Sequence, residues 1–521
     1  MPAPFFTSNP AEYDRVPGLY ITERNPPGAI RGRSLNGVAV FGPCVRGPVD
    51  QVIEVTSRAR FEEIFGARDY GAGGDLVGKV WRSLLNKPFG KLYVCRAAAA
   101  AAATASFGLE DTDGGGGQIV LTVSAANPGA WGNDVKVLVE AATDADANHF
   151  NLVVSYLGRT VTYQNLDCSG ANDNLATVIG DDLGTWIVAT KDNSGRPLNF
   201  ASFTGGFAAA LDADGYINLG ETVASFTSVA GTEGTIAGTD YTAAGRAIPT
   251  IATYRGASGS PSIVFSAEDT TALVTSINTA LITASATVND RVFIIWTGDH
   301  TDTDADAATY ADSVSRTDRV ILAWNSPYTI DPETASEIQT PPAEWLASTL
   351  SQIDVDVHPG EEATKAFTRG ISRLTNPSLA REAYADLQAA GVAAYEADGG
   401  FAIVSGVTLS LTSGLEKITR RRSADFLQLS AGDRLKYFVK KKNTEARRRV
   451  IGGELTSFTD ELKRSERVVE DYAIDQESVN TVAGRAAGRE FILWRVKLLG
   501  HFLALILQTE IGTGVTIEVG Q

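Results

Sequence analysis

The chain has 521 residues, more than a single hydrophobic core usually organises, so its length predicts about three or four domains. Hydrophobic residues make up 44% and charged residues 21% of the chain, a balance typical of globular proteins and not of disordered ones. The formal net charge of -17 disfavours general nucleic-acid binding, which requires a basic surface.

Residue types that build metal or redox sites are scarce. Three scattered cysteines (Cys44, Cys95 and Cys168) fit neither a disulfide framework nor a zinc site, and the four histidines show no paired metal spacing. The chain begins without the pattern of a signal peptide, and its apolar run at 491–507 is short and interrupted by charges. We therefore expect cytoplasmic synthesis, no membrane segment, no metal and no cofactor.

Residues 1–32 are rich in proline, which fixes φ and removes a backbone donor, so we expect an extended N-terminal arm. Within this arm, Leu19 and Ile21 alternate with Tyr20 and Thr22, the pattern of an isolated strand.

The segment 33–96 is predicted to be the N-terminal α/β part of a core. An apolar strand is expected at 37–42, and a helix should start at Ser57 and end near Gly66. A second helix is expected at about 76–85, before the chain returns as a strand at 91–96.

The composition changes at residue 97 to an alanine-rich and then glycine-rich stretch, which indicates a linker into an insertion. Short strand-like runs separated by glycine, asparagine and aspartate follow. They lie at 118–123, 135–140, 151–156 and 159–163. We therefore predict a β-rich surface insertion domain over 97–246.

An α/β pattern resumes over 247–375. Two fully apolar strands, 291–296 and 319–324, alternate with helices at 270–284 and 309–315. Strands that are apolar on both faces predict a largely parallel sheet covered by helices on each side.

The segment 376–512 is predicted to be a C-terminal α/β domain, followed by a strand in the last segment, 513–521. The expected helices lie at 379–390, 434–444 and 457–466, and the expected strands at 392–395, 401–404, 491–499 and 502–511. The last two strands flank Gly500 and His501, which predicts an antiparallel hairpin. In the terminal strand, Val515, Ile517 and Val519 share one face.

Two acidic runs have part of the spacing of a calcium loop. The run 302–306 lacks the glycine and the glutamate that such a loop needs at its sixth and twelfth positions. The run 212–221 has both, but Ala210 replaces the first carboxylate. We interpret both as polar loops. No Gly-x-Ser-x-Gly elbow and no Walker loop occurs, so no catalytic residue is assigned.

One segment of this acidic chain is strongly basic: between Glu416 and Arg449, basic residues outnumber acidic ones by about eight. A solvated helix face and a nucleic-acid patch are both possible interpretations, but the segment lacks the interleaved aromatic residues that stack on bases. We therefore favour contact with an acidic protein, because such charge asymmetry steers docking and sets register.

The two strand-like ends allow two interpretations. An isolated strand leaves its backbone donors and acceptors unpaired and needs the edge of another sheet. The ends could fold back onto their own domain, or they could add to the sheets of neighbouring copies. If each copy adds its strand to the next copy, and the rotation between copies does not close a ring, the copies would build a helical filament.

Several short motifs of the sequence occur in a recognisable order. They are PGLYITE at 17–23, GVAVFGP at 37–43, RGPV at 46–49, FEEIFG at 61–66, NPGAWGN at 127–133, PPA at 341–343 and QTEIG at 508–512, with further likeness at 320–332, 387–392, 420–426 and 438–443. Together these motifs resemble those of contractile phage tail sheath proteins.

The resemblance implies an α+β multidomain fold: α/β core domains, one of them subtilisin-like (over 247–375) without a catalytic triad, a β-rich insertion and two extended arms. It implies stacked hexameric rings around a tail tube, contraction that drives the tube through the host envelope, and contacts with the tail tube, baseplate and tail terminator proteins. Nucleic acid and membrane insertion are not expected. The location implied is the virion, after assembly in the host cytoplasm.

The resemblance also assigns residues. The intersubunit arms would use Leu19, Tyr20, Ile21, Val515, Ile517 and Val519, and the C-terminal domain would face the tube through Arg434, Lys436, Lys440, Lys441, Lys442, Arg447, Arg448 and Arg449. The alternative function is a hydrolase-like enzyme with β-rich binding modules, for which the sequence offers no nucleophile and base. A cell-surface binding protein is the third possibility.

Overall fold

The computed structural model describes residues 30–66, 76–78, 91–111, 117–144, 146–169, 173–180, 182–203, 205–223, 226–256, 259–331 and 335–501, and two short strands near the N-terminus, β1 (Phe5–Phe6) and β2 (Tyr20–Ile21). The chain divides into two compact units. The large unit is Ser34–Arg422, and the small unit combines Met1–Arg33 with Ser423–Gln521.

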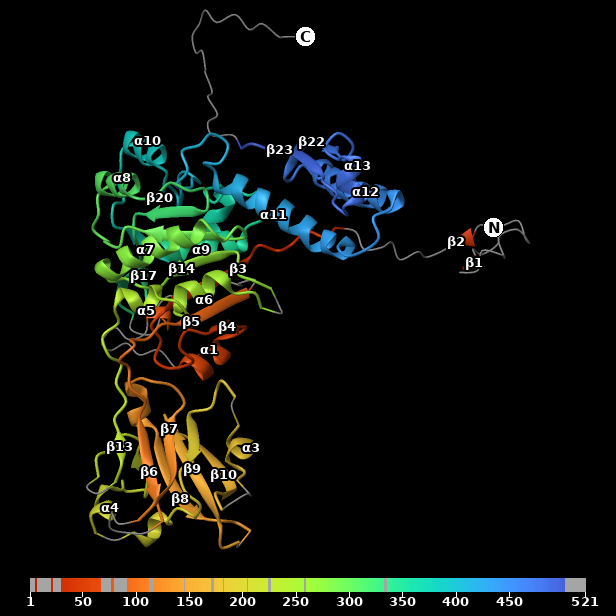
Figure 1. Cartoon of the computed structure of the whole chain (residues 1–521). Coiled ribbons are helices and arrows are strands. Elements are labelled where there is room, and N and C mark those ends of the chain that lie inside the picture. The colour runs from red at the N-terminus through yellow and green to blue at the C-terminus, as the bar shows by residue number, and fades with distance from the viewer. Residues whose placement is uncertain are drawn as a thin grey trace, which may run out of the picture. The chain divides into compact units, whose positions relative to one another are not determined.

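An eight-stranded sheet forms the centre of the large unit, in the order β21-β20-β16-β15-β14-β3-β5-β4 (Figure 1). Its central strands run parallel, whereas the edge strands β4 and β21 are antiparallel to their neighbours. Their bounds are β3 (Gly37–Gly42), β4 (Val52–Val55), β5 (Lys91–Arg96), β14 (Ile263–Ser266), β15 (Val292–Trp296), β16 (Val320–Trp324), β20 (Val392–Ala397) and β21 (Phe401–Ile403).

Helices cover both faces of this sheet, which is why its strands are apolar at successive positions. One face packs against α5 (Gly238–Thr242), α6 (Ala247–Thr253), α7 (Thr271–Ser285), α8 (Asp304–Ser313) and α10 (Arg381–Ala390). The other face packs against α1 (Arg58–Phe65) and α9 (Pro342–Gln352). As predicted, α1 is capped by the Ser57 side chain and ends at Gly66, whose φ of 92° suits glycine.

A β-sandwich is inserted between β5 and α5, and Figure 1 shows its strands (orange to yellow) as a body separate from the eight-stranded sheet. Two four-stranded sheets, β10-β9-β8-β12 and β11-β7-β6-β13, enclose a core of their own. The bounds are β6 (Ser106–Glu110), β7 (Ile119–Ala125), β8 (Lys136–Ala141), β9 (His149–Tyr156), β10 (Arg159–Asp167), β11 (Ile187–Lys191), β12 (Ile217–Asn218) and β13 (Ser228–Val229). Short helices complete it: η2 (Ala130–Asp134), α3 (Leu175–Ile179), η3 (Phe200–Ser202) and α4 (Gly205–Ala210).

Two arginines lie where the β-sandwich joins the core. Arg96, which is 1% exposed, donates to the carbonyl oxygens of Cys44 and Gly47 in the core and of Pro128 in the β-sandwich, at 3.1, 2.9 and 2.9 Å. Arg246 donates to the carboxylate of Asp50 at 2.7 Å and to that of Asp240 at 2.6 Å. Because each guanidinium spans several chain segments, it fixes the insertion at its root.

A smaller sheet, β18-β17-β19, comprises β17 (Pro327–Ile330), β18 (Glu337–Gln339) and β19 (Ile371–Leu374). Along the chain, α9 and then η4 (Glu362–Thr368) lie between β18 and β19. None of the helices that the structure describes is both long and apolar enough to span a membrane.

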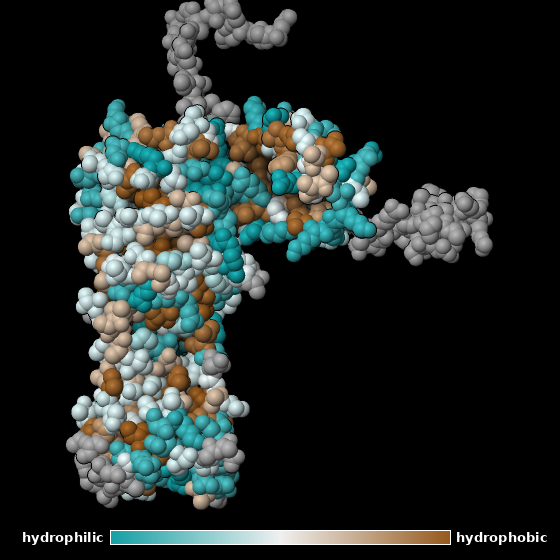
Figure 2. Space-filling model, viewed as in Figure 1, coloured by the Kyte–Doolittle hydropathy of each residue, from teal (hydrophilic) through white to brown (hydrophobic). Residues whose placement is uncertain are grey.

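The helix α11 (Ile418–Leu435) begins in the large unit and ends in the small unit. The small unit continues with η5 (Lys436–Phe438), α12 (Glu445–Arg464), β22 (Val469–Asp475), α13 (Val482–Ala486) and β23 (Leu493–Leu498). In Figure 2, apolar residues (brown) reach its surface beside charged ones (teal), and Val482 and Phe491 are 88% and 58% exposed.

Two features of the C-terminal half differ from the sequence-based expectations, and a third expectation is tested only in part. The strands β20 and β21 belong to the eight-stranded sheet, because β20 pairs with β16, so the change of unit comes at Ser423 and not at residue 376. The predicted helix at 434–444 is wrong, since a loop separates η5 from α12 there. The strand expected at 491–499 exists as β23, but it pairs with β22, and 502–511 lies outside the described residues.

Candidate functional site

The first part of the basic segment lies inside the large unit. Arg422 is 2% exposed and donates to the carbonyl oxygen of Leu350 at 2.7 Å, and Arg421 donates to the carboxylate of Asp318 at 2.9 Å. These two arginines therefore stabilise the fold where α11 leaves the sheet. Charge density along the sequence does not by itself indicate a charged surface.

Arg434 also has an internal role. Its guanidinium makes two hydrogen bonds to the carboxylate of Glu454, at 2.9 and 2.6 Å, and these bonds raise the pKa of Arg434. The side chains are only 15% and 10% exposed, and the guanidinium lies 4.9 Å from the ring centre of Tyr437. Arg434 thus connects the end of α11 to α12, and nearby Lys436 pairs with Asp433 at 3.0 Å.

The next lysines project from the loop between η5 and α12. Lys440, Lys441 and Lys442 are exposed. The ammonium of Lys441 lies 3.0 Å from the ring centre of Tyr437, and its hydrogen bond lowers the pKa of that phenol. No acceptor within the described part of the chain contacts the side-chain ammonium of Lys440 or of Lys442.

Three arginines continue this surface along the start of α12. Arg447 and Arg448 bond to loop atoms, the carbonyl oxygen of Lys442 and the side chain of Asn443, at 2.7 and 2.9 Å. Arg449 pairs with Glu445 at 2.6 Å with both side chains exposed. We call residues 440–449 the basic loop. Of the predicted contact residues, it contains all except Arg434 and Lys436.

The predicted arm residues fall mostly outside the described part of the chain. Tyr20 and Ile21 form β2, which pairs in parallel with β1. Leu19, Val515, Ile517 and Val519 lie outside the described residues.

The two-stranded sheet of the small unit has open edges. β22 and β23 pair antiparallel from Val469↔Leu498 to Asp475↔Leu493, and no other described strand pairs with either of them. α12 supports this sheet through the Tyr472 hydroxyl, which donates to Asp460 at 2.6 Å. An isolated pair of strands is marginal in water and presents unpaired backbone groups along both edges, so this sheet is a template for further strands.

The acidic runs are bonded within the protein. Thr303 and Asp306 form a reciprocal capping box at the start of α8, with hydrogen bonds of 3.2 and 3.0 Å. The carboxylate of Asp212 accepts a hydrogen bond from Lys136 at 2.7 Å, which lowers the pKa of Asp212. No cluster of three or more metal-binding side chains occurs among the described residues.

Open parallel sheets bind ligands at the carboxyl ends of strands where the strand order reverses, which here is between β3 and β14. Glu268 lies just after β14, is 2% exposed, and accepts hydrogen bonds from the Tyr241 hydroxyl at 2.5 Å and from the backbone of Thr270 at 3.0 Å. Burial, together with Glu268, raises the pKa of Tyr241. This pair joins α5 to the start of α7 and so acts in the fold.

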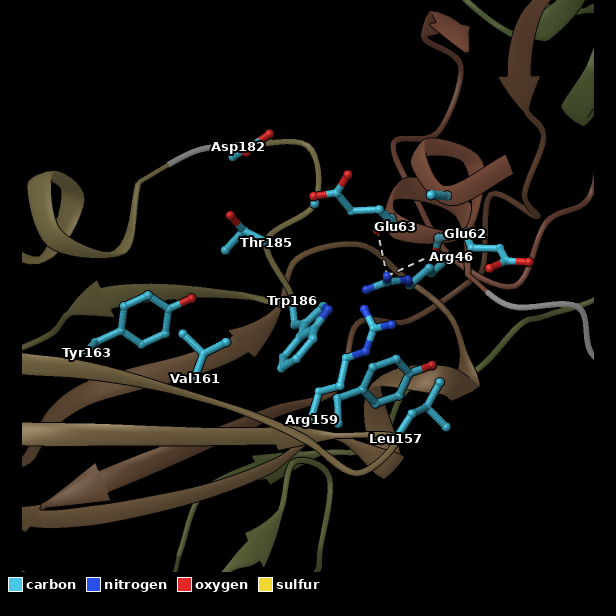
Figure 3. A pocket seen from close by; sticks show the side chains of 13 residues that line it. Arg46, Glu62, Glu63, Leu157, Arg159, Val161, Tyr163, Asp182, Thr185 and Trp186 are labelled. Atoms are coloured by element: carbon cyan, nitrogen blue, oxygen red, sulfur yellow. Dashed lines mark hydrogen bonds between the residues drawn. The ribbon is translucent and has the colours of Figure 1, made fainter. Parts of the chain in front are cut away.

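One surface feature was not anticipated from the sequence. An open pocket of about 630 Å³ lies between α1 and the β9–β10 hairpin, with Arg46, Arg159 and Trp186 in its wall (Figure 3). Its lining residues come from two stretches of the sequence, 46–63 and 156–186, that are more than 90 positions apart, and each is unremarkable in its local context. No sequence signal could have found it.

With this geometry in place, the class of protein can be stated: the chain has the mixed α/β multidomain fold of contractile sheath proteins. No protein-family model matches the sequence, and no curated protein matches it either.

Three solved structures illustrate the likeness. The sheath tail protein of Desulfitobacterium hafniense aligns at a TM-score of 0.55 with 13% identity over 92% of this chain and 100% of its own, and that of Listeria innocua at 0.58 with 13% identity over 90% and 97%. The helical sheath of the anti-feeding prophage in its contracted state aligns at 0.51 with 12% identity over 95% and 99%. At these identities the likeness is one of fold, and it agrees with the family resemblance in the sequence.

Proposed function

We propose that this chain is a structural subunit of a contractile tail sheath, which polymerises as stacked hexameric rings around a tail tube and contracts to drive the tube through a host envelope. The observation that carries the proposal is the agreement of fold over 90% or more of this chain and nearly the whole length of sheath proteins. The subtilisin-like assignment of the 247–375 region is part of the same proposal.

Strand exchange would join the subunits. The open edges of β22 and β23 offer unpaired backbone groups, and the N- and C-terminal arms supply strands of matching alternation. Arms from neighbouring copies would complete this sheet, so that its stability depends on assembly. Connectivity would then persist while the domains of each subunit rotate as rigid bodies during contraction.

The basic loop is the proposed contact with an acidic tail tube protein. Its arginines stand at the N-terminal end of α12, where the helix macrodipole already places partial positive charge. Cations at this end interact unfavourably with the macrodipole, so the stability of the helix alone does not favour arginines here. Solvated ion pairs would set register while staying weak enough to exchange as the sheath moves.

The other partners and the location that we propose are those of a subunit of a tail particle. Baseplate and tail terminator proteins would contact the two ends of the polymer, and the protein would reside in the virion or a related particle after assembly in the host cytoplasm. The matched proteins are structural sheath components, which supports a non-enzymatic role, and no observation favours the hydrolase alternative.

Electron microscopy of the purified protein tests the assembly. We expect rings or hollow cylinders from the full chain, and their loss when residues 514–521 are deleted, because the terminal strand would no longer reach a neighbour. Circular dichroism should show that the truncated chain is still folded. A full chain that stays a uniform monomer under all assembly conditions overturns the polymer.

Charge reversal in the basic loop tests the tube contact. Replacing Lys440, Lys441 and Lys442 by glutamate should weaken assembly on purified tail tubes at least tenfold, because three attractions become repulsions. Replacement of the same lysines by arginine is the matched control and should leave tube-templated assembly unchanged. Equal assembly by both variants would remove the basic loop from the interface.

A further inference from the structure

The pocket between α1 and the β9–β10 hairpin is built by two parts of the large unit. The core contributes Arg46 and, from α1, Glu62 and Glu63, while the β-sandwich contributes β10 and the segment 182–186 (Figure 3). Its volume of about 630 Å³ lies within the range of small-molecule sites.

The floor of the pocket lies at the edge of the β-sandwich, where residues of its core face, aromatic ones included, are not fully covered. β10 is an edge strand, and its Val161 and Tyr163 pair with Val154 and Leu152 of β9, whose side chains are fully buried. Val161 therefore points to the core face and is nevertheless 38% exposed.

Two further rings extend this floor. Tyr156 and Trp186 meet edge to face with ring centres 5.8 Å apart, and both line the pocket. The floor thus offers aromatic faces to a ligand.

Arg46 is a buried cation with unused hydrogen-bonding capacity. It is 6% exposed, and its guanidinium lies between 5 and 6 Å from the ring centres of Tyr156 and Trp131, at 5.4 and 5.7 Å. One terminal nitrogen donates to the carbonyl oxygens of Glu62 and Glu63, whereas the buried Nε has no hydrogen-bond partner. The other terminal nitrogen makes no hydrogen bond to the described residues, so an acceptor from a ligand would be favourable there.

Arg159 brings a second guanidinium to the same wall, close enough that its charge contributes to lowering the pKa of Arg46, although burial is the larger cause. No acceptor from the described residues contacts its side chain. Figure 3 shows the two guanidinium groups next to each other, beside Trp186. Two cations held together with no anion between them favour an anionic ligand.

The carboxylates on the rim offset only part of this charge: Glu63 raises the pKa of Arg46, but each rim carboxylate also has an arginine partner outside the pocket. Glu62 pairs with Arg58 at 2.6 Å, and Glu63 and Asp182 pair with Arg60 at 2.7 and 3.5 Å. These carboxylates keep lone pairs that can accept hydrogen bonds from hydroxyl groups, but they would repel a multiply charged phosphate.

We infer that this pocket binds a sugar that carries a carboxylate, a uronic or sialic acid unit. The carboxylate would lie between Arg46 and Arg159, the C–H face of the ring would stack on Trp186, and the hydroxyls would donate to Glu63 and Asp182. Such a ligand matches each of the three kinds of group in the wall: the arginines, the aromatic rings and the carboxylates. This inference does not rest on the sheath proposal.

Isothermal titration calorimetry of the full chain with sodium D-glucuronate, N-acetylneuraminate and a glucuronate-containing oligosaccharide tests it. We expect saturable binding of at least one acidic sugar. If the natural ligand is a polysaccharide, the oligosaccharide should bind more tightly than the monosaccharides. If it is a free monosaccharide, the affinity per sugar unit should be equal. Arg159→Ala and Trp186→Leu should each weaken binding at least tenfold. Thr162→Ala, at an exposed position of the same strand outside the pocket lining, is the matched control and should bind as the unmodified protein does.

Glucose and inorganic phosphate distinguish the chemistry. Neutral glucose should bind at least tenfold more weakly, because it lacks the anion. Absence of saturable binding to all three acidic probes overturns the inference, as does phosphate binding that equals sugar binding and is insensitive to Trp186→Leu. Arg159 and Thr162 are exposed, so their variants should fold, and a circular dichroism spectrum checks Trp186→Leu.

Discussion

Buried arginines contribute more to this fold than its acidic composition would indicate. Arg96 and Arg291 are each 1% exposed, and Arg291 donates to the carbonyl oxygen of Ile251 at 2.7 Å. Carbonyl oxygens at strand and loop ends carry partial negative charge and need donors, and one guanidinium satisfies several of them. Replacing such an arginine by lysine would leave some of these carbonyls without a donor.

Half-buried His300 is predicted to make stability depend on pH. Its ring packs against Trp296 with centres 4.7 Å apart, and burial lowers the pKa of His300 from 6.5 to about 4. The unfolded chain binds the proton first as the pH falls below 6.5, so unfolding becomes easier until the folded pKa is reached. We expect this histidine to remove about 2 kcal/mol of stability between pH 7 and pH 5.

Urea unfolding at the two pH values measures this effect. In the His300→Gln variant, the stability loss between pH 7 and pH 5 should be smaller than in the unmodified protein by that amount. His149→Gln is the control. Asp144 lies 2.6 Å from the His149 ring, and this contact raises the pKa of His149, whereas the pKa of His300 is lowered. An unchanged pH dependence in His300→Gln would contradict the assignment.

At the scale of elements, one ion pair holds the two long helices of the C-terminal part together. Arg434 lies in the last turn of α11, where the helix macrodipole also favours a cation, and Glu454 lies in the middle of α12. We expect Arg434→Ala to destabilise the packing of α12 by about 2 kcal/mol, because Glu454 keeps a largely buried charge without its partner.

Urea-dependent hydrogen exchange of α12 peptides measures this change. Arg449→Ala is the matched control, since Arg449 is on the same helix and pairs with Glu445 in solvent, and it should leave the exchange unchanged. Equal effects of the two substitutions would show that Arg434 is as solvated as Arg449.

At the scale of the whole molecule, the β-sandwich is a removable insertion. The chain enters and leaves it side by side, with reciprocal backbone hydrogen bonds of 3.0 Å between Ala103 and Thr232. It also has its own hydrophobic core. Domains with these properties generally fold independently.

Replacing 104–231 by an Asn-Gly turn should therefore leave the eight-stranded sheet folded. Its stability should fall by about 2 kcal/mol, because Arg96 loses the Pro128 carbonyl and becomes exposed. Circular dichroism and urea unfolding check both expectations, and the segment 104–231 expressed alone should give a β-sheet spectrum. An insoluble or unstructured core after excision would mean that the insertion is needed for folding.

Local patterns in the sequence predicted many elements of the fold. Apolar runs predicted β3, β15 and β16, and the Ser57 and Gly66 signals predicted the two ends of α1. These features depend on neighbours a few residues away, which the sequence displays directly. The order of motifs also indicated the sheath fold.

The long-range partners were decided only by the tertiary structure. That β23 pairs with β22 and that β20 joins the main sheet depends on contacts between distant residues. The exposure of charge is of the same kind: Arg422 and Arg434 have the same local sequence character as Lys440, yet two are bonded inside the protein and one faces solvent.

The sequence by itself therefore determined the elements, the mixed α/β class and the family resemblance, because periodicity, caps and motifs are local properties of the chain. Only the tertiary structure decided which cations form the basic loop, which sheet edges stay open among the described strands and that a pocket joins Arg46 to Arg159. The physical reason is that burial and pairing are set by residues far apart in the chain, whose approach depends on the packing of the whole unit.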